Sequence, residues 1–124
     1  NVKLNYIEEW NNKRTINATY YKQNLKNELI LHEEKTVKHA HHIFAIKTDR
    51  RKGLVNAMKN NHIETKIHYP ITLSENDTIK SNLKKNLSDS IDFVKKVLSI
   101  PMNPWLEEKE LFSVVRIIND FYDR

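Results

Sequence analysis

The residues with the clearest chemical potential end the stretch IETKIHYP, residues 63 to 70. Its alternation of apolar and polar residues is typical of a half-buried strand, with His68 on one face and Tyr69 on the other. Pro70 closes the stretch, because it has no N–H to donate to a sheet. The end of this stretch has two possible explanations. It is a plain strand boundary, or it presents an imidazole and a phenol to a ligand, beside the long polar loop at about 71–87.

A second group of candidates is the histidine cluster HAHH, which contains His39, His41 and His42. On a strand His39 and His41 would share a face, and such a pair could supply two ligands to a metal ion. No aspartate or glutamate stands at strand spacing beside them, so the sequence predicts no metal site. His42 falls on the same face as Phe44 and Ile46 and is expected to pack with them.

Three acidic residues, Glu107, Glu108 and Glu110, raise the question of paired catalytic carboxylates. They fall in the first turn of an expected helix, where acidic side chains are stabilising, and we favour that structural explanation. Gly53 is the only glycine, so there is no glycine-rich phosphate loop, and no serine stands in a nucleophile elbow. No lysine has the strongly apolar surroundings that a Schiff-base amine needs.

Length and composition suit one modest domain, since 39% of the 124 residues are apolar and 30% are charged. The formal net charge is +5, but the 21 basic and 16 acidic residues are mixed along the chain. We therefore expect no specific nucleic-acid partner. Without cysteine there is no disulfide or thiolate site, which fits a cytoplasmic protein. No apolar run approaches the roughly 18 residues of a membrane span, so we expect no membrane partner.

Hydrophobic periodicity predicts the helices and strands that would position these residues. A first helix at residues 3–27 has apolar residues at helical spacing but a polar middle, so it is expected to pack on another part of the protein. Three strands with helices on one side then make a small α+β domain. The remaining elements are expected as a strand at 37–47, a helix ending near 60, a strand at 63–69, a helix from Ser88 or Ser90 to Val97, a strand in VLSIPMNP and a helix at 107–122.

Most of the chain, from about residue 4 to 122, resembles a known family in four motifs. HHIFAIKTDRRKGLVNAMKNNHIETKIHYP contains two of them, a strand with its following arginine-started helix and the HYP strand. The third motif, VLSIPMNPWLEEKELFSVVRIINDFY, is similar to the turn and last helix that close the chain in this family. All four occur in the C-terminal part of the DegT/DnrJ/EryC1/StrS sugar aminotransferases. The fourth motif, R-x-x-x-A-x-x-Y-x-x-x-L, is matched by Arg14, Ala18, Tyr21 and Leu25.

The resemblance implies a homodimeric pyridoxal-phosphate enzyme of the aspartate-aminotransferase fold. Such enzymes transfer an amino group, usually from glutamate, to a keto group on a nucleotide-linked sugar, in amino-sugar or cell-surface polysaccharide biosynthesis. A large N-terminal domain would supply the cofactor lysine, so no catalytic residue is expected here. The chain begins at Asn1, without a methionine, and is expected to be part of a longer protein. Residues 1–27 would link to the large domain, and residues 28–124 would form the C-terminal small α+β domain.

The same resemblance assigns roles to two residues of the HYP motif. In the family this strand reaches towards the active-site cleft. His68 would donate to a hydroxyl or phosphate oxygen of the sugar nucleotide. Tyr69 would offer a flat apolar face with a polar tip. Both residues are therefore predicted to bind and shape the substrate.

The chain departs from the family at three places. Ile71-Thr72-Leu73 replaces the usual Pro-x-His after HYP, so no substrate contact is carried over to that loop. Asn61 stands for the glycine that ends a helix, and Glu107 for the usual threonine or serine before the last helix. The alternative hypothesis is a stand-alone basic α+β module that binds a polyanion or a protein partner.

Overall fold

The computed structural model describes residues 2–31, 38–75 and 87–124. These residues form an α+β structure, as the sequence predicted, and they contain no helix long and apolar enough to cross a membrane. The α-helices and strands are α1 (Ile7–Asn24), β1 (Phe44–Lys47), α2 (Arg51–Asn60), α3 (Ser88–Lys96), β2 (Val97–Ile100) and α4 (Glu108–Tyr122). Short 3-10 helices lie at Val2–Tyr6, Asn27–Leu29 and Leu73–Glu75.

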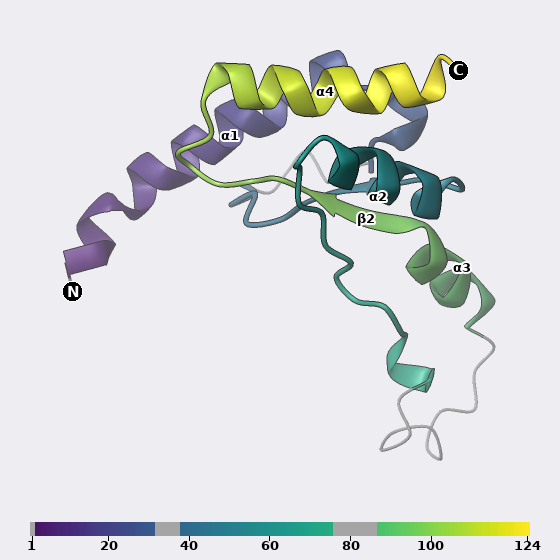
Figure 1. Cartoon of the computed structure of the whole chain (residues 1–124). Helices are drawn as coiled ribbons and strands as arrows, with labels where there is room; N and C mark the ends of the chain where they lie inside the picture. Colours follow the sequence, from purple (N-terminus) through teal and green to yellow (C-terminus); the bar gives the residue numbers. More distant parts are fainter. Residues whose placement is uncertain (1, 32–37, 76–86) are drawn as a thin grey trace.

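The core lies between the two strands and a layer of helices. Helix α4 packs against both α1 and α2, and Figure 1 shows the C-terminal part of α1 passing behind α4, above the strands. The strands β1 and β2 pair antiparallel, with Phe44 opposite Ile100 and Ile46 opposite Leu98. All four of these side chains are buried in the core together with apolar residues of the helices. The apolar stripe of α4 supplies Leu111, Val114, Val115, Ile117 and Ile118.

The predicted third strand at 63–69 is absent from the described residues. Its segment meets the sheet at one antiparallel bridge, between Lys66 and Ser99. The Lys66 N–H donates to the Ser99 carbonyl at 3.0 Å, and the Ser99 N–H donates to the Lys66 carbonyl at 2.7 Å. The sequence therefore predicted correctly that this segment lies beside the sheet, but the three-stranded sheet was wrong.

Neighbouring backbone groups explain why the ladder stops after one bridge. In an antiparallel ladder the next bonded pairs would be Glu64 with Pro101 and His68 with Val97. Pro101 has no N–H to donate. The Val97 N–H is already used, because it donates to the Phe93 carbonyl at the end of α3. Side-chain alternation is visible in the sequence, whereas this competition for backbone groups is not.

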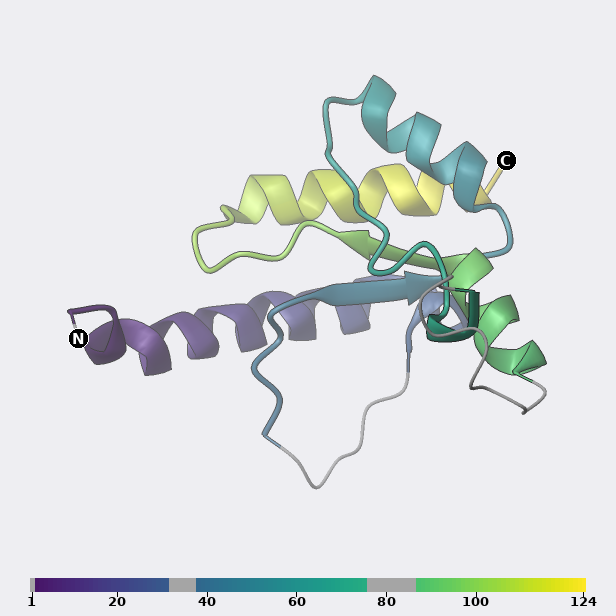
Figure 2. The ribbon, with the colours of Figure 1, turned by 90° about the horizontal axis from the view of Figure 1, so that it is seen from below.

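The first helix has two parts with different surroundings. Its inner half, residues 17–25, contributes Ala18, Tyr21 and Leu25 to the core. Its outer half, residues 2–16, includes the 3-10 turn at Val2–Tyr6 and extends away from the sheet (Figure 2). Leu4 is 62% exposed there, and Ile16 is 66% exposed. Apolar residues at helical spacing therefore occur in both halves, but only those of the inner half are buried.

Candidate functional site

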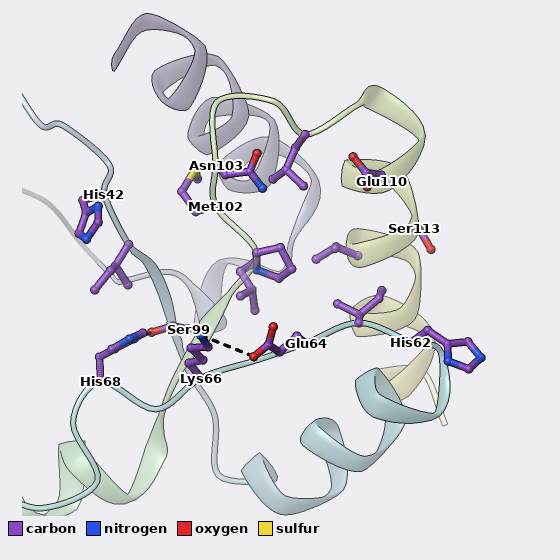
Figure 3. Close-up of a pocket in the computed structure, with 16 residues that line it drawn as sticks. His42, His62, Glu64, Lys66, His68, Ser99, Met102, Asn103, Glu110 and Ser113 are labelled. Atoms are coloured by element: carbon purple, nitrogen blue, oxygen red, sulfur yellow. Dashed lines mark hydrogen bonds and ion pairs between the residues drawn. The ribbon is translucent and has the colours of Figure 1, made fainter. Parts of the chain in front are cut away.

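A cavity of about 520 Å³ opens between the end of β2, the turn that follows it, α4 and the segment around residues 62–68 (Figure 3). Cavities of this size are typical of small-molecule sites, and the lining of this one is both apolar and polar. The apolar lining residues are Ile43, Ile63, Ile100, Pro101, Met102, Leu106 and Val114. The polar lining residues are His42, His62, Glu64, Lys66, His68, Ser99, Asn103, Glu110 and Ser113.

His68, one of the two predicted site residues, lines this cavity. Its ring atom Nδ1 lies 2.9 Å from the Oγ of Ser99, a hydrogen-bond distance. Figure 3 shows the two side chains next to each other at the edge of the cavity. The bond holds the half-buried imidazole in one orientation, and the other ring nitrogen, Nε2, takes no part in it.

Tyr69, the second predicted site residue, has a different environment. It is 73% exposed and does not line the cavity. Its ring stays beside that of His68, with the ring centres 5.9 Å apart and the planes nearly perpendicular. The structure therefore brings His68 to the cavity and places Tyr69 on the surface next to it.

The turn after β2, which forms one wall of the cavity, is held by the inner half of α1. The hydroxyl of Tyr21 donates to the Pro101 carbonyl at 2.9 Å. The side-chain amide of Asn17 donates to the Asn103 carbonyl, also at 2.9 Å. Burial, together with the Glu110 carboxylate, raises the pKa of the Tyr21 phenol, so Tyr21 stays a protonated donor. A helix 80 residues upstream thus fixes the shape of the cavity wall.

The acidic residues at the start of α4 have the structural role that the sequence predicted. The carboxylate of Glu110 accepts a hydrogen bond from the backbone N–H of Glu107 at 2.8 Å. This bond belongs to a capping box at the first turn of α4. Glu107 thus serves as the helix cap although it replaces a more usual threonine or serine. Although Glu110 also lines the cavity, one of its oxygens is committed to the cap.

The histidine cluster differs from the prediction in two respects. The strand β1 begins at Phe44, so His39 and His41 do not share a strand face. Instead, Nδ1 of His39 accepts a hydrogen bond from the backbone N–H of His41 at 2.9 Å. His42, which was expected to pack with Phe44 and Ile46, is exposed at the mouth of the cavity, and His41 is the buried one. The strand alternation used for the prediction does not extend back to these residues.

Two polar residues of the site were missed by sequence reasoning. Ser99 stands in the apolar stretch VLSI, whose pattern predicts a strand and gives no role to its one polar residue. Asn103 lies between two prolines at the end of that predicted strand, and the pattern gives it no role either. In both cases the sequence did contain a signal: a side chain that can form hydrogen bonds stands at a position that the strand or the turn does not require to be polar.

Comparison with known proteins identifies the family. The profile of the DegT/DnrJ/EryC1/StrS aminotransferase family matches residues 1–119, which is nearly the whole chain. The chain therefore belongs to the DegT/DnrJ/EryC1/StrS aminotransferase family, as its motifs indicated. It spans 34% of the length of the curated relatives that it matches, so it corresponds to about a third of such a protein.

Two curated relatives are sugar transaminases. The chain is 27% identical over 122 residues to dTDP-3-amino-3,6-dideoxy-alpha-D-galactopyranose transaminase of Aneurinibacillus thermoaerophilus, and the match covers 97% of this chain. It is 25% identical over 128 residues to dTDP-3-amino-3,4,6-trideoxy-alpha-D-glucose transaminase of Streptomyces venezuelae, and that match covers 99% of this chain.

Solved structures confirm the fold. DesV of Streptomyces venezuelae, solved in complex with a ketimine intermediate, superposes with a TM-score of 0.92 at 23% identity. That match covers 99% of this chain and 34% of DesV. A family member from Brucella abortus superposes with a TM-score of 0.91, also at 23% identity, over 98% of this chain and 34% of its own.

Proposed function

We propose that the full-length protein is a pyridoxal-phosphate-dependent aminotransferase. It transfers the amino group of glutamate to a keto group on a nucleotide-linked sugar, in the biosynthesis of amino sugars or cell-surface polysaccharides. The observation that carries the proposal is the family match over residues 1–119. The two curated relatives, both named as transaminases of dTDP-linked sugars, support the substrate class.

The described residues do not fit the part of the site that binds the cofactor covalently. A lysine that forms an imine with pyridoxal phosphate needs a desolvated pocket. Every lysine in residues 2–31, 38–75 and 87–124 is exposed or half-buried. Lys66 lines the cavity, but its side chain is 63% exposed and lies 3.5 Å from the Glu64 carboxylate. Following the family that the motifs resemble, we assign the cofactor lysine to a large N-terminal domain.

Within this chain we assign substrate binding to the HYP motif. His68 lines a cavity with both apolar and polar walls and is held by a hydrogen bond, which suits a group that orients a ligand. It would donate to a hydroxyl or phosphate oxygen of the sugar nucleotide. Tyr69, exposed beside it, would cover the substrate from outside once the rest of the enzyme is present. Both residues bind and shape, and the acid–base chemistry belongs to the cofactor lysine.

The division of the chain and its assembly are part of the same proposal. Residues 1–27 connect to the large domain, with residues 17–25 of this connection packed in the core of the small domain, which residues 28–124 form. The outer half of the first helix supports this, because Val2 is 76% exposed and Leu4 is 62% exposed, as expected of apolar side chains that another domain covers. We further propose a homodimer in the cytoplasm, as in the family that the motifs resemble.

The experiment that tests the function is an assay of the full-length protein with pyridoxal phosphate, glutamate and a dTDP-linked keto-sugar. We expect formation of the amino sugar together with 2-oxoglutarate. The 124-residue chain alone, assayed in parallel, is expected to give no turnover, because it lacks the cofactor lysine. Turnover by this chain alone, or none by the full-length protein with any dTDP-linked keto-sugar, would contradict the proposal.

A further inference from the structure

Ser99 is a buried polar residue at the edge of the cavity. It stands in β2 between Leu98 and Ile100, whose side chains face the core, so its own side chain points to the opposite face of the sheet. The residue is only 5% exposed. A buried hydroxyl needs a hydrogen-bond partner, and an alanine here would avoid that requirement.

Ser99 makes three hydrogen bonds to the segment that carries the HYP motif. Two join its backbone to that of Lys66 and form the single bridge of this segment to the sheet. The third joins its Oγ to Nδ1 of His68 at 2.9 Å. One residue thus fixes both the path of the segment and the orientation of the imidazole two residues further on.

The direction of the side-chain bond follows from what each group leaves unused. Within the described residues, the bond to His68 is the one hydrogen bond of the Ser99 hydroxyl. If the hydroxyl accepted a hydrogen bond from an Nδ1–H group, its own hydrogen would be left without a partner in a buried place. If it donates to Nδ1, only acceptor lone pairs are left unused. Protein interiors tolerate an unused acceptor more often than an unused donor. A neutral His68 then carries its proton on Nε2.

We propose that Ser99 is a positioning residue, whose hydroxyl donates to Nδ1 of His68 and so presents the Nε2–H group as a donor to an oxygen of the sugar nucleotide. The inference rests on the proposed function, in which His68 binds that substrate. It adds the residue that sets the tautomer and the direction of the donor. A histidine in the other tautomer would present a lone pair at Nε2, which a sugar hydroxyl could still meet by donating but an ionised phosphate oxygen could not, so the proposed tautomer is the one that serves both kinds of oxygen.

The first test is a double-mutant cycle in the full-length enzyme, with kcat/KM for the sugar nucleotide as the readout. Ser99→Ala is expected to lower it about 2- to 10-fold, the effect of one lost neutral hydrogen bond. Ser99→Thr keeps the hydroxyl and is expected to stay within about twofold of the wild type. In the His68→Ala background, Ser99→Ala is expected to have no further effect.

The cycle separates positioning from a purely structural role. A structural role of Ser99 predicts the same loss in the presence and in the absence of the imidazole, and that result would overturn the proposal. The proposal also fails if Ser99→Ala changes nothing while His68→Ala impairs use of the sugar nucleotide. Both results leave the proposed function intact.

The second test reads the tautomer directly. The full-length protein is labelled with ¹⁵N-histidine, and the His68 ring signals are identified by their loss in His68→Ala. We expect a protonated Nε2 and an Nδ1 that accepts a hydrogen bond, with the Nδ1 signal shifted by Ser99→Ala and retained by Ser99→Thr. A protonated Nδ1 in the wild type would overturn the inference. The tautomer measurement is independent of the activity measurement. If His68→Ala leaves use of the sugar nucleotide unchanged, the proposed role of His68 in substrate binding is refuted, whatever its tautomer.

Discussion

The two halves of the first helix have similar residue patterns but different surroundings. The inner half, residues 17–25, is anchored in the core, and Tyr21 is fully buried with its hydroxyl bonded to the Pro101 carbonyl. The outer half, residues 2–16, exposes Ile7 to 44% and Ile16 to 66%. The difference shows that apolar spacing gives a helix its potential contact face, but a second element must be present before that face is buried.

The outer half is attached by an aromatic contact at the surface and by a hydrogen bond from Nε of Arg14 to the Ala40 carbonyl at 3.1 Å. Trp10 packs edge-on against Trp105, with their ring centres 5.6 Å apart, and Tyr6 stacks on Trp10 at 6.0 Å. Trp105 itself is 65% exposed. Such contacts bury little area, so we expect them to contribute far less to stability than the inner half does.

The largest expected effect is on stability. Tyr21→Ala removes a fully buried aromatic ring and is expected to lower the free energy of unfolding by about 3–5 kcal/mol. In the 124-residue chain, where Ile16 is exposed, the matched truncation Ile16→Ala in the same helix is expected to change the free energy of unfolding by less than about 0.5 kcal/mol. Urea unfolding of both variants measures the difference. Equal losses would contradict the division of the helix into two halves.

A second test compares the two halves without mutation. Hydrogen exchange of backbone amides in the 124-residue chain is expected to show strong protection from about residue 19 to 25. These amides exchange only when the core unfolds. Amides at residues 8–12 are expected to exchange nearly as fast as those of an unfolded chain, since local fraying exposes them. Uniform protection along the whole helix would show that the outer half is stabilised as well, for example by self-association.

A smaller effect is expected when only the hydroxyl of Tyr21 is removed. Tyr21→Phe leaves the Pro101 carbonyl without its side-chain donor and is expected to cost about 0.5–1.5 kcal/mol. The variant also tests the raised pKa. Thermal unfolding of both proteins as a function of pH measures the two effects.

The direction of the pH effect follows from the raised pKa of Tyr21. In the unfolded chain its pKa has the ordinary value of 10.0, and burial raises it in the folded protein. The favourable contribution of neutral Tyr21 is therefore complete below about pH 10 and is lost as the pH rises towards the folded-state pKa. Tyr21→Phe should show a shallower loss of stability above pH 10. Identical alkaline profiles would mean that the phenol is not desolvated as described.

Sequence reasoning predicted the class of the fold and the order of its helices, because these depend on periodicity and local motifs; the role of His68 in substrate binding stays a prediction. It failed where distant backbone groups decide the outcome. The third strand was lost because Pro101 has no N–H and Val97 uses its own in α3. The position of His42 was wrong because β1 begins only at Phe44. Ser99 was missed because its partner lies 31 residues away in the sequence.

The central claim is that His68 acts on the sugar nucleotide and not on the cofactor, and the two half-reactions of the full-length enzyme test it most directly. With His68→Ala, kcat/KM for the sugar nucleotide is expected to fall about 3- to 150-fold, the effect of one hydrogen bond to a neutral or charged oxygen. The glutamate half-reaction, followed without sugar, is expected to change much less. Equal losses in both half-reactions, or no loss in either together with lower stability, would contradict the account.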